Sequence, residues 1–133
     1  MKHLWSIICN RLIIDEQTNN ATLVDVLEEI KIREEFLQSK EEVAFFFNFV
    51  SLWFVESDDE YDKETNVIIE FYSPNKNKLN EFNFSFALPK RKKRIRTNIK
   101  FDKFILEGSG TYRIKVKQDN TEVAEIPLEI AII

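Results

Sequence analysis

The sequence predicts an all-β protein, folded as one antiparallel, two-layer β-sandwich of seven to eight strands over residues 1–133. Two observations carry this prediction. Short runs of apolar residues alternate with polar ones along most of the chain, and clusters of Asp, Asn, Ser, Pro or Gly separate these runs. A chain of 133 residues is long enough for a core that needs no disulfide.

The segment Glu42–Glu56, EVAFFFNFVSLWFVE, predicts the central strand of this sandwich. Alternate residues on one face are Val43, Phe45, Phe47, Phe49, Trp53 and Val55, and those on the other are Ala44, Phe46, Val50, Leu52 and Phe54. Because both faces are apolar and rich in Phe, Trp and Val, we expect a strand that is covered on both sides. The run is too short to span a membrane, which takes roughly 20 residues in a helix.

The chain before the central segment predicts a first strand over Leu4–Ile14 and a turn over Asp15–Asn20. The segment Ala21–Ile32 is ambiguous. A strand would group Val24, Val26, Ile30 and Ile32 on one face, whereas a helix would group Leu23, Val26, Leu27, Ile30 and Leu37. The β-branched residues favour the strand, and Arg33–Lys40 then suits one short helix or a loop that crosses between sheets.

The chain after the central segment alternates loops and strands. The acidic residues 56–66 predict a solvated loop, Val67–Tyr72 a strand and Ser73–Lys78 a turn. The alternation of apolar and polar residues from Phe82 to Leu88 predicts a strand with one buried and one solvent-exposed face, and Pro89 ends this strand. Further strands are predicted through Ile95–Phe101, through Tyr112–Val116 and over Ala124–Ile132, the last after a tight Asp119–Asn120 turn. Pro127 cannot donate to a ladder, so we expect an edge there.

Charge and cysteine content restrict the possible functions. The net charge of −4 argues against a protein that coats nucleic acid with its whole surface. Cys9 is the only cysteine, which excludes an intramolecular disulfide and favours a reducing, cytoplasmic location. The apolar run before Cys9 is too short for a secretion signal. With His3 as the only histidine, a tetrahedral zinc site is not expected.

Two short motifs carry a resemblance. The opening W-x-x-x-C-x-x-x-I-x-D comprises Trp5, Cys9, Ile13 and Asp15, and the closing G-x-Y-x-I-x-V begins at Gly110 and Tyr112. The opening motif is similar to that of a family of short, uncharacterised bacterial proteins with an immunoglobulin-like sandwich. The closing motif looks like the late strand of immunoglobulin-type domains, in which a Tyr hydroxyl can pin a loop. The resemblance implies this fold and supplies no catalytic residue.

The sequence contains no recognisable catalytic set. It has no phosphate loop, dinucleotide fingerprint or G-x-S-x-G motif. His3 is close to the N-terminus, where chains usually fray, and Cys9 is expected to be buried in a strand. We therefore predict a protein that is not an enzyme and has no cofactor.

Two charged segments are the candidate sites. The acidic loop, with Asp58, Asp59, Glu60 and Asp62, is either plainly solvated or faces a basic partner. Calcium binding is a weaker alternative, because the loop lacks the Gly that such sites usually use. The basic run comprises Lys90, Arg91, Lys92, Lys93, Arg94 and Arg96. It is either a solvated connection that deters edge pairing or a binding site for a protein's acidic surface, for nucleic acid or for anionic lipid.

These observations predict a non-catalytic protein-interaction or scaffolding module of a bacterial cell. It would bind a partner protein, or itself, through sheet edges and charged loops. The alternative is a polyanion-binding domain that holds nucleic acid or anionic lipid through Lys90–Arg96.

Overall fold

A computed structural model describes residues 1–37 and 42–133, with side chains given except at 36–37, 42–45 and 103–104. Within these residues the chain forms nine strands and two short 3₁₀ helices, at Glu34–Leu37 and Asp58–Glu60. The strands are β1 (Lys2–Ile14), β2 (Ala21–Val26), β3 (Glu29–Ile32), β4 (Glu42–Phe54), β5 (Thr65–Tyr72), β6 (Lys78–Phe86), β7 (Arg94–Ile105), β8 (Gly110–Gln118) and β9 (Thr121–Ile132).

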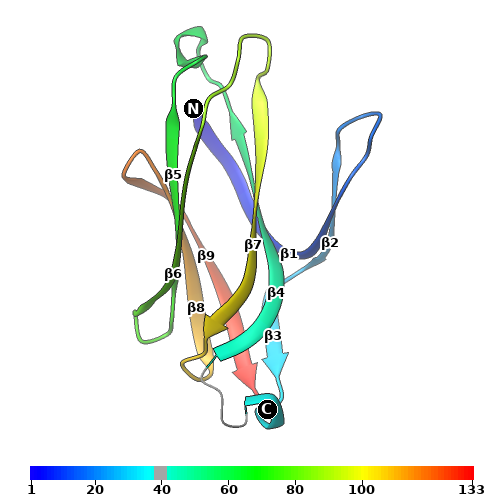
Figure 1. Cartoon of the computed structure of the whole chain (residues 1–133), viewed down its shortest axis with the longest axis vertical. Helices are drawn as coiled ribbons and strands as arrows, with labels where there is room; N and C mark the ends of the chain where they lie inside the picture. Colours follow the sequence, from blue (N-terminus) through cyan, green and yellow to red (C-terminus); the bar gives the residue numbers. More distant parts are fainter. Residues whose placement is uncertain (38–41) are drawn as a thin grey trace.

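The strands form two sheets that pack face to face as a sandwich (Figure 1). One sheet has the order β2-β1-β4-β7 and the other the order β3-β9-β8-β5-β6. All pairs are antiparallel except β3 with β9, which is parallel. The predicted two-layer fold is confirmed, with one strand more than the upper limit of the prediction and with a second 3₁₀ helix in the acidic loop.

The strand order is that of an immunoglobulin-type sandwich. Strands β1, β4 and β7 neighbour one another as strands A, B and E do, and β5, β8 and β9 do so as C, F and G do. Near the start of β8, the Tyr112 hydroxyl accepts a hydrogen bond from Glu107 N and donates one to Gly108 O, both at 2.8 Å. This is the loop-pinning role that the closing motif predicted.

Strand β4 is the centre of its sheet, as predicted, with β1 on one side and β7 on the other. On its inner face Phe47, Phe49 and Trp53 are buried in the core. Phe47 stacks on Phe101 of β7 at 4.7 Å, and the Trp53 indole nitrogen donates to Thr97 Oγ1 at 3.0 Å. Phe47 also contacts Phe71 of β5, and Trp53 contacts Phe86 of β6, with ring centroids 6.3 and 5.6 Å apart. The aromatic residues of β4 therefore join the two sheets, and Thr97 satisfies the polar atom of Trp53.

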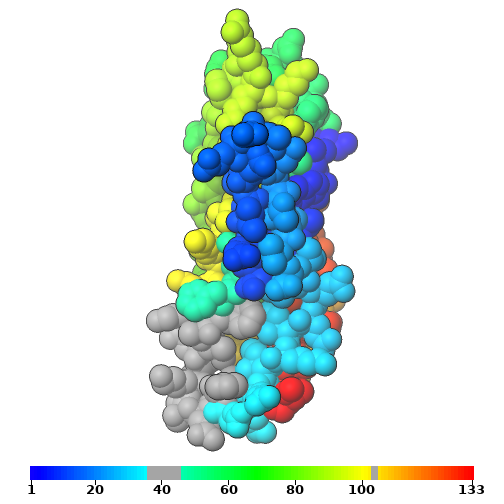
Figure 2. Space-filling view, turned by 90° about the vertical axis from the view of Figure 1, so that its right-hand side faces the viewer, coloured from blue at the N-terminus to red at the C-terminus, as the bar shows by residue number. Residues whose placement is uncertain are grey.

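The outer face of β4 is covered by a hairpin rather than by a sheet. Strand β1 pairs with β4 only up to Cys9 and then continues with β2 alone. The β1–β2 hairpin folds back across the outer face (Figures 1 and 2), and Arg96 Nη2 donates to Asn19 O at 2.7 Å. Val50 on this face is fully buried, whereas Phe46 is 71% exposed. The expectation of complete cover is therefore wrong at Phe46. The prediction for Val43, Ala44 and Phe45 concerns side chains outside those described.

The ambiguous segment 21–32 is extended, and a break at residues 27–28 divides it into β2 and β3. Because β2 and β3 belong to different sheets, the chain changes sheet at this break and returns between β3 and β4. The predicted short helix is present as Glu34–Leu37, while residues 38–40 of the predicted crossing lie outside the described part.

The turns and the last strand follow the sequence prediction. Asp15 Oδ1 accepts hydrogen bonds from Gln17 N and Thr18 N, and Asp119 and Asn120 both have positive φ. Strand β3 pairs with β9 only from Glu129 onward, so β9 has an edge at Pro127, as predicted. No helix in the described residues has the length and apolar character needed to cross a membrane.

Candidate functional site

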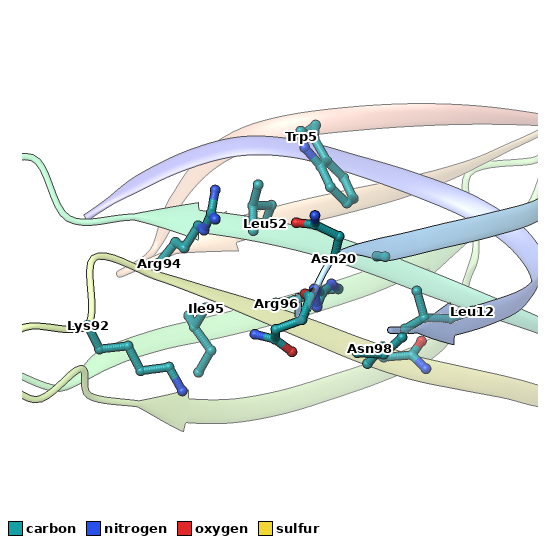
Figure 3. A pocket seen from close by; sticks show the side chains of 12 residues that line it. Trp5, Leu12, Asn20, Leu52, Lys92, Arg94, Ile95, Arg96 and Asn98 are labelled. Atoms are coloured by element: carbon teal, nitrogen blue, oxygen red, sulfur yellow. Dashed lines mark hydrogen bonds between the residues drawn. The ribbon is translucent and has the colours of Figure 1, made fainter. Parts of the chain in front are cut away.

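A groove of about 630 Å³ lies between the β1–β2 hairpin and the outer face of β4 and β7. Its volume is within the range of small-molecule and peptide sites. Its lining combines apolar, amide and cationic side chains (Figure 3). The lining residues are Trp5, Leu12, Ile14, Asn19, Asn20, Ala21, Leu52, Lys92, Arg94, Ile95, Arg96 and Asn98.

The cations come from the start of β7 and the turn before it. In a strand alternate residues point to the same face, so Arg94, Arg96 and Asn98 share the outer face of the sheet. Arg94 pairs with Phe54 and Arg96 with Leu52 across the ladder with β4. Lys92 precedes the strand, in a turn that Lys92 N closes by donating to Pro89 O at 3.1 Å. Lys92 and Arg94 lie toward one end of the groove, with Arg96 nearer its middle (Figure 3).

The apolar part of the groove comes from β1 and β4. Trp5, Leu12 and Leu52 are half-buried, so each still presents apolar surface to an incoming group. Trp5 pairs with Leu52 in the β1–β4 ladder, next to the irregularity between His3 and Trp5. The bend of β1 then brings Leu12, seven residues later, to the same groove. An aromatic ring beside cations provides both contact area and orientation for a ligand.

The cations of the groove are not neutralised within the described part of the chain. Lys92, Arg94 and Arg96 have no carboxylate within ion-pair distance among the described residues. Arg96 is held in place by the neutral carbonyl of Asn19, which leaves its charge uncompensated. Lys92 and Arg94 are exposed, while Arg96 is half-buried. The groove is therefore a local positive region on a protein of net charge −4.

The structure divides the predicted basic run in two. Lys92, Arg94 and Arg96 line the groove, whereas Lys90, Arg91 and Lys93 are exposed and do not line it. Arg91 has a φ of 81°, which marks the turn between β6 and β7. Two sets of cations from one run thus occupy different places, and one set serves as a natural control for the other.

The acidic loop lies at the same end of the sandwich as the basic turn. Val55 N donates to Lys93 O, and Asp62 N donates to Leu88 O, each at 2.8 Å. Glu60 is used internally: its carboxylate accepts from Glu56 N at 2.7 Å and pairs with the Met1 nitrogen. Asp59 accepts from the Ser57 hydroxyl, which lowers the pKa of Asp59.

The other acidic residues of the loop, Asp58 and Asp62, are exposed. No group of three or more potential metal ligands is found within the ranges that the structure describes.

One histidine–serine contact invites comparison with a catalytic dyad. His3 Nε2 lies 2.6 Å from Ser6 Oγ, which lies 2.7 Å from Ser51 Oγ. Ser51 is fully buried, and burial lowers the pKa of His3. The expectation that His3 frays is wrong, because His3 pairs with Trp53 in the β1–β4 ladder. Because the His3 ring packs edge-on against Trp53 at 5.1 Å and Ser51 lies in the interior, we interpret the chain of three groups as polar packing.

Sequence reasoning found the cations of the groove but not its other walls. The sequence places Trp5 only in the opening motif, Leu12 only in a strand and Asn20 only in a turn. These residues meet Arg94 because β1 bends, and the alternation of apolar residues in β1 carries no sign of that bend. The only available signal was the interruption of the apolar pattern at Asn10 and Arg11.

Comparisons with known proteins add little to this geometry. No protein-family model matches the chain, and no curated protein matches it. A solved immunoglobulin-like protein from Pseudomonas aeruginosa is similar at 12% identity, over 92% of this chain and 90% of its own, with a TM-score of 0.40. No residue role is carried over from it.

Proposed function

We propose that this β-sandwich is a non-catalytic interaction module whose groove binds an acidic segment of a partner protein. The observation that carries the proposal is the group of three cations, Lys92, Arg94 and Arg96, which line the groove and have no carboxylate partner among the described residues. A carboxylate would supply the missing charge, and guanidinium groups bind carboxylates in a bidentate geometry.

The apolar wall favours a protein segment over a simple polyanion. Trp5 and Leu52 lie beside the cations, so a ligand that carries both carboxylates and apolar side chains complements the groove better than a bare phosphate chain. Trp5 is the only aromatic side chain among the described residues of the lining, whereas single-stranded nucleic acid is usually held by stacking on several. A reducing, cytoplasmic location stays a prediction, which rests on Cys9 being the only cysteine of the sequence.

The test is a titration of a fluorescent peptide that contains Glu and Leu, with heparin and phosphatidylserine vesicles as parallel probes. The protein is compared with Lys92→Glu/Arg94→Glu and with the matched control Lys90→Glu/Lys93→Glu. Arg96 is left unchanged because it also anchors the hairpin. We expect the groove variant to lose about tenfold or more in peptide affinity and the control to lose less than about threefold.

Two results would overturn the proposal. Equal losses in the two variants would mean that binding follows the charge of the whole run and not the groove. Binding of heparin or vesicles without binding of the peptide would assign the cations to a polyanion instead.

A further inference from the structure

We infer that the acidic segment binds as an additional β-strand along the open edge of β7. This inference rests on the proposed function and specifies the conformation and residue pattern of the partner. Strand β7 is the last strand of its sheet and pairs only with β4, so the other side of its backbone has no strand partner among the described residues. An extended peptide can satisfy such an edge with main-chain hydrogen bonds.

Strand β7 is better suited to this role than the other edge strands. The edge strands β2, β3 and β6 have six, four and nine residues, against 12 for β7. Residue Asp25 in β2 has a φ of 52°, which disturbs a regular ladder, whereas no described residue of β7 has a positive φ. The sequence of β7 contains neither Pro nor Gly. Its edge is therefore long and regular enough for about seven residues of a partner.

The outer row of β7 defines one half of the partner's pattern. Arg94, Arg96, Asn98 and Lys100 follow one another in this row, which is continuous with the groove at its start and reaches Asp102 only beyond Lys100. Residues opposite one another on neighbouring strands have Cβ atoms about 5 Å apart, so alternate side chains of an added strand would face these cations. Carboxylates at those alternate positions would be stabilised, and cations there would be repelled.

The inner row defines the other half. Ile95 and Ile99 of β7 are only half-buried, as are Phe84 and Phe86 of the opposite edge strand β6. The two edges meet on one side of the sandwich, where Phe82 contacts the Phe101 ring at 5.0 Å. Apolar side chains of an added strand would cover this side. Along β7 the partner segment is thus an alternation of acidic and apolar residues, and the end of the segment that enters the groove beside Arg94 is where an apolar residue would meet Leu52 and Trp5.

A second copy of the chain is a poorer occupant of the same edge. Antiparallel pairing of two β7 strands about Thr97 would place Arg94 opposite Lys100, so cation would face cation. Like charges directly opposite each other destabilise a strand pair. Within Arg94–Lys100 the charges of β7 therefore act against self-pairing and in favour of an acidic partner, and only registers that reach Asp102 would set a cation opposite a carboxylate.

The test uses the capped heptapeptide Glu-Val-Glu-Val-Glu-Val-Glu. A control of the same composition, Val-Val-Val-Glu-Glu-Glu-Glu, lacks the alternation. Two further peptides carry backbone N-methyl groups, either on every Glu or on every Val. In an added strand only alternate amide groups point toward β7, so one methylated peptide should lose about tenfold or more in affinity and the other less than about threefold. The control of equal composition should bind at least about tenfold more weakly than the alternating peptide.

The outcomes separate the inference from the proposed function. If both methylated peptides bind like the parent, or both lose affinity equally, strand addition is wrong, while a groove that binds acidic peptides through side chains still stands. If the alternating peptide and its control both fail to bind, the proposed function falls as well. Dimerisation of the unliganded protein that Arg94→Glu strengthens, by setting a carboxylate opposite Lys100, would assign the edge to a second copy instead.

Discussion

Glu70 is the most constrained charged residue described in the structure. It lies on the outer face of β5, where its side chain is only 3% exposed between Lys78 at 2.6 Å and Lys117 at 2.7 Å. Burial alone would raise the pKa of Glu70, but the contacts with Lys117 and Lys78 outweigh it and bring the pKa to about 2. The same contacts raise the pKa of both lysines. Glu70 therefore ties β5 to its two neighbours, β6 and β8.

Glu70→Gln is expected to lower the free energy of unfolding at pH 7 by about 2–3 kcal/mol. The loss is moderate because both lysines reach solvent once the carboxylate is removed. The matched control is Glu81→Gln, whose carboxylate is an exposed partner of Lys78 and should contribute under about 1 kcal/mol. Urea denaturation measures both, and equal effects would contradict the role given to Glu70.

The same residue predicts a pH dependence. The folded-state pKa of Glu70 is below the ordinary value of 4.5, so the unfolded chain binds this proton first as the pH falls. The stabilisation is fully present above pH 4.5 and is lost between about pH 4.5 and pH 2. The difference in stability between the protein and Glu70→Gln should shrink over this interval, and a constant difference would contradict the assignment.

Tyr112→Phe tests the loop-pinning hydroxyl. The substitution keeps the buried ring but leaves Glu107 N and Gly108 O without the partner that now lies 2.8 Å from each. We expect a loss of about 1–2 kcal/mol in the free energy of unfolding, seen as a lower urea midpoint with an unchanged slope. An unchanged midpoint would show that the hydroxyl does not stabilise the loop.

At the scale of the element, the β1–β2 hairpin is the feature that creates the groove on the outer face of the sandwich. The second half of β1 leaves β4 and pairs only with β2, and the hairpin tip is fastened to β7 by the bond from Arg96 to Asn19 O. At its base, Cys9 is fully buried in a row between Val26 and Asn48. The hairpin thus covers the outer face of β4 and forms one wall of the groove.

Arg96→Gln is expected to loosen this hairpin without unfolding the sandwich. Amide hydrogen exchange over Leu12–Val26 should accelerate, while β8 keeps its protection, because β8 lies in the other sheet. The Cys9 thiol should also react faster with a disulfide reagent. Arg113→Gln is the control, since Arg113 is an arginine on β8 that pairs with Glu125. If exchange over the hairpin is the same in both variants, the fastening role of Arg96 is wrong.

An element could be predicted only as far as the pattern of apolar and polar residues along it indicates its surroundings. Strand β4 was predictable because apolar residues on both faces demand cover on both faces, whatever supplies it. The alternation in β1 could not show that its second half leaves β4, because a bent strand keeps the same period of two. The break between β2 and β3 was hidden for a related reason: both halves are extended, and only their sheets differ.

At the scale of the whole molecule, the fold follows from residues that the sequence displays plainly, whereas the candidate site does not. The immunoglobulin-type order of β1, β4, β7 and of β5, β8, β9 buries the aromatic residues that predicted a sandwich. The groove brings Trp5, Leu12 and Arg94 together across almost 90 residues of chain, through a bend whose one trace in the sequence is the interrupted apolar pattern at Asn10 and Arg11. The sequence shows the cations of the groove, but it does not show which other residues surround them.

The most direct test of the central claim, that groove cations select an acidic partner, is a reciprocal exchange of charge. The alternating Glu-Val heptapeptide and its Lys-Val counterpart are titrated against the protein and against Lys92→Glu/Arg94→Glu at physiological salt. We predict that the protein binds the Glu peptide and the variant prefers the Lys peptide, with both affinities falling as salt rises. A variant that keeps the affinity of the original protein for the Glu peptide would contradict the account.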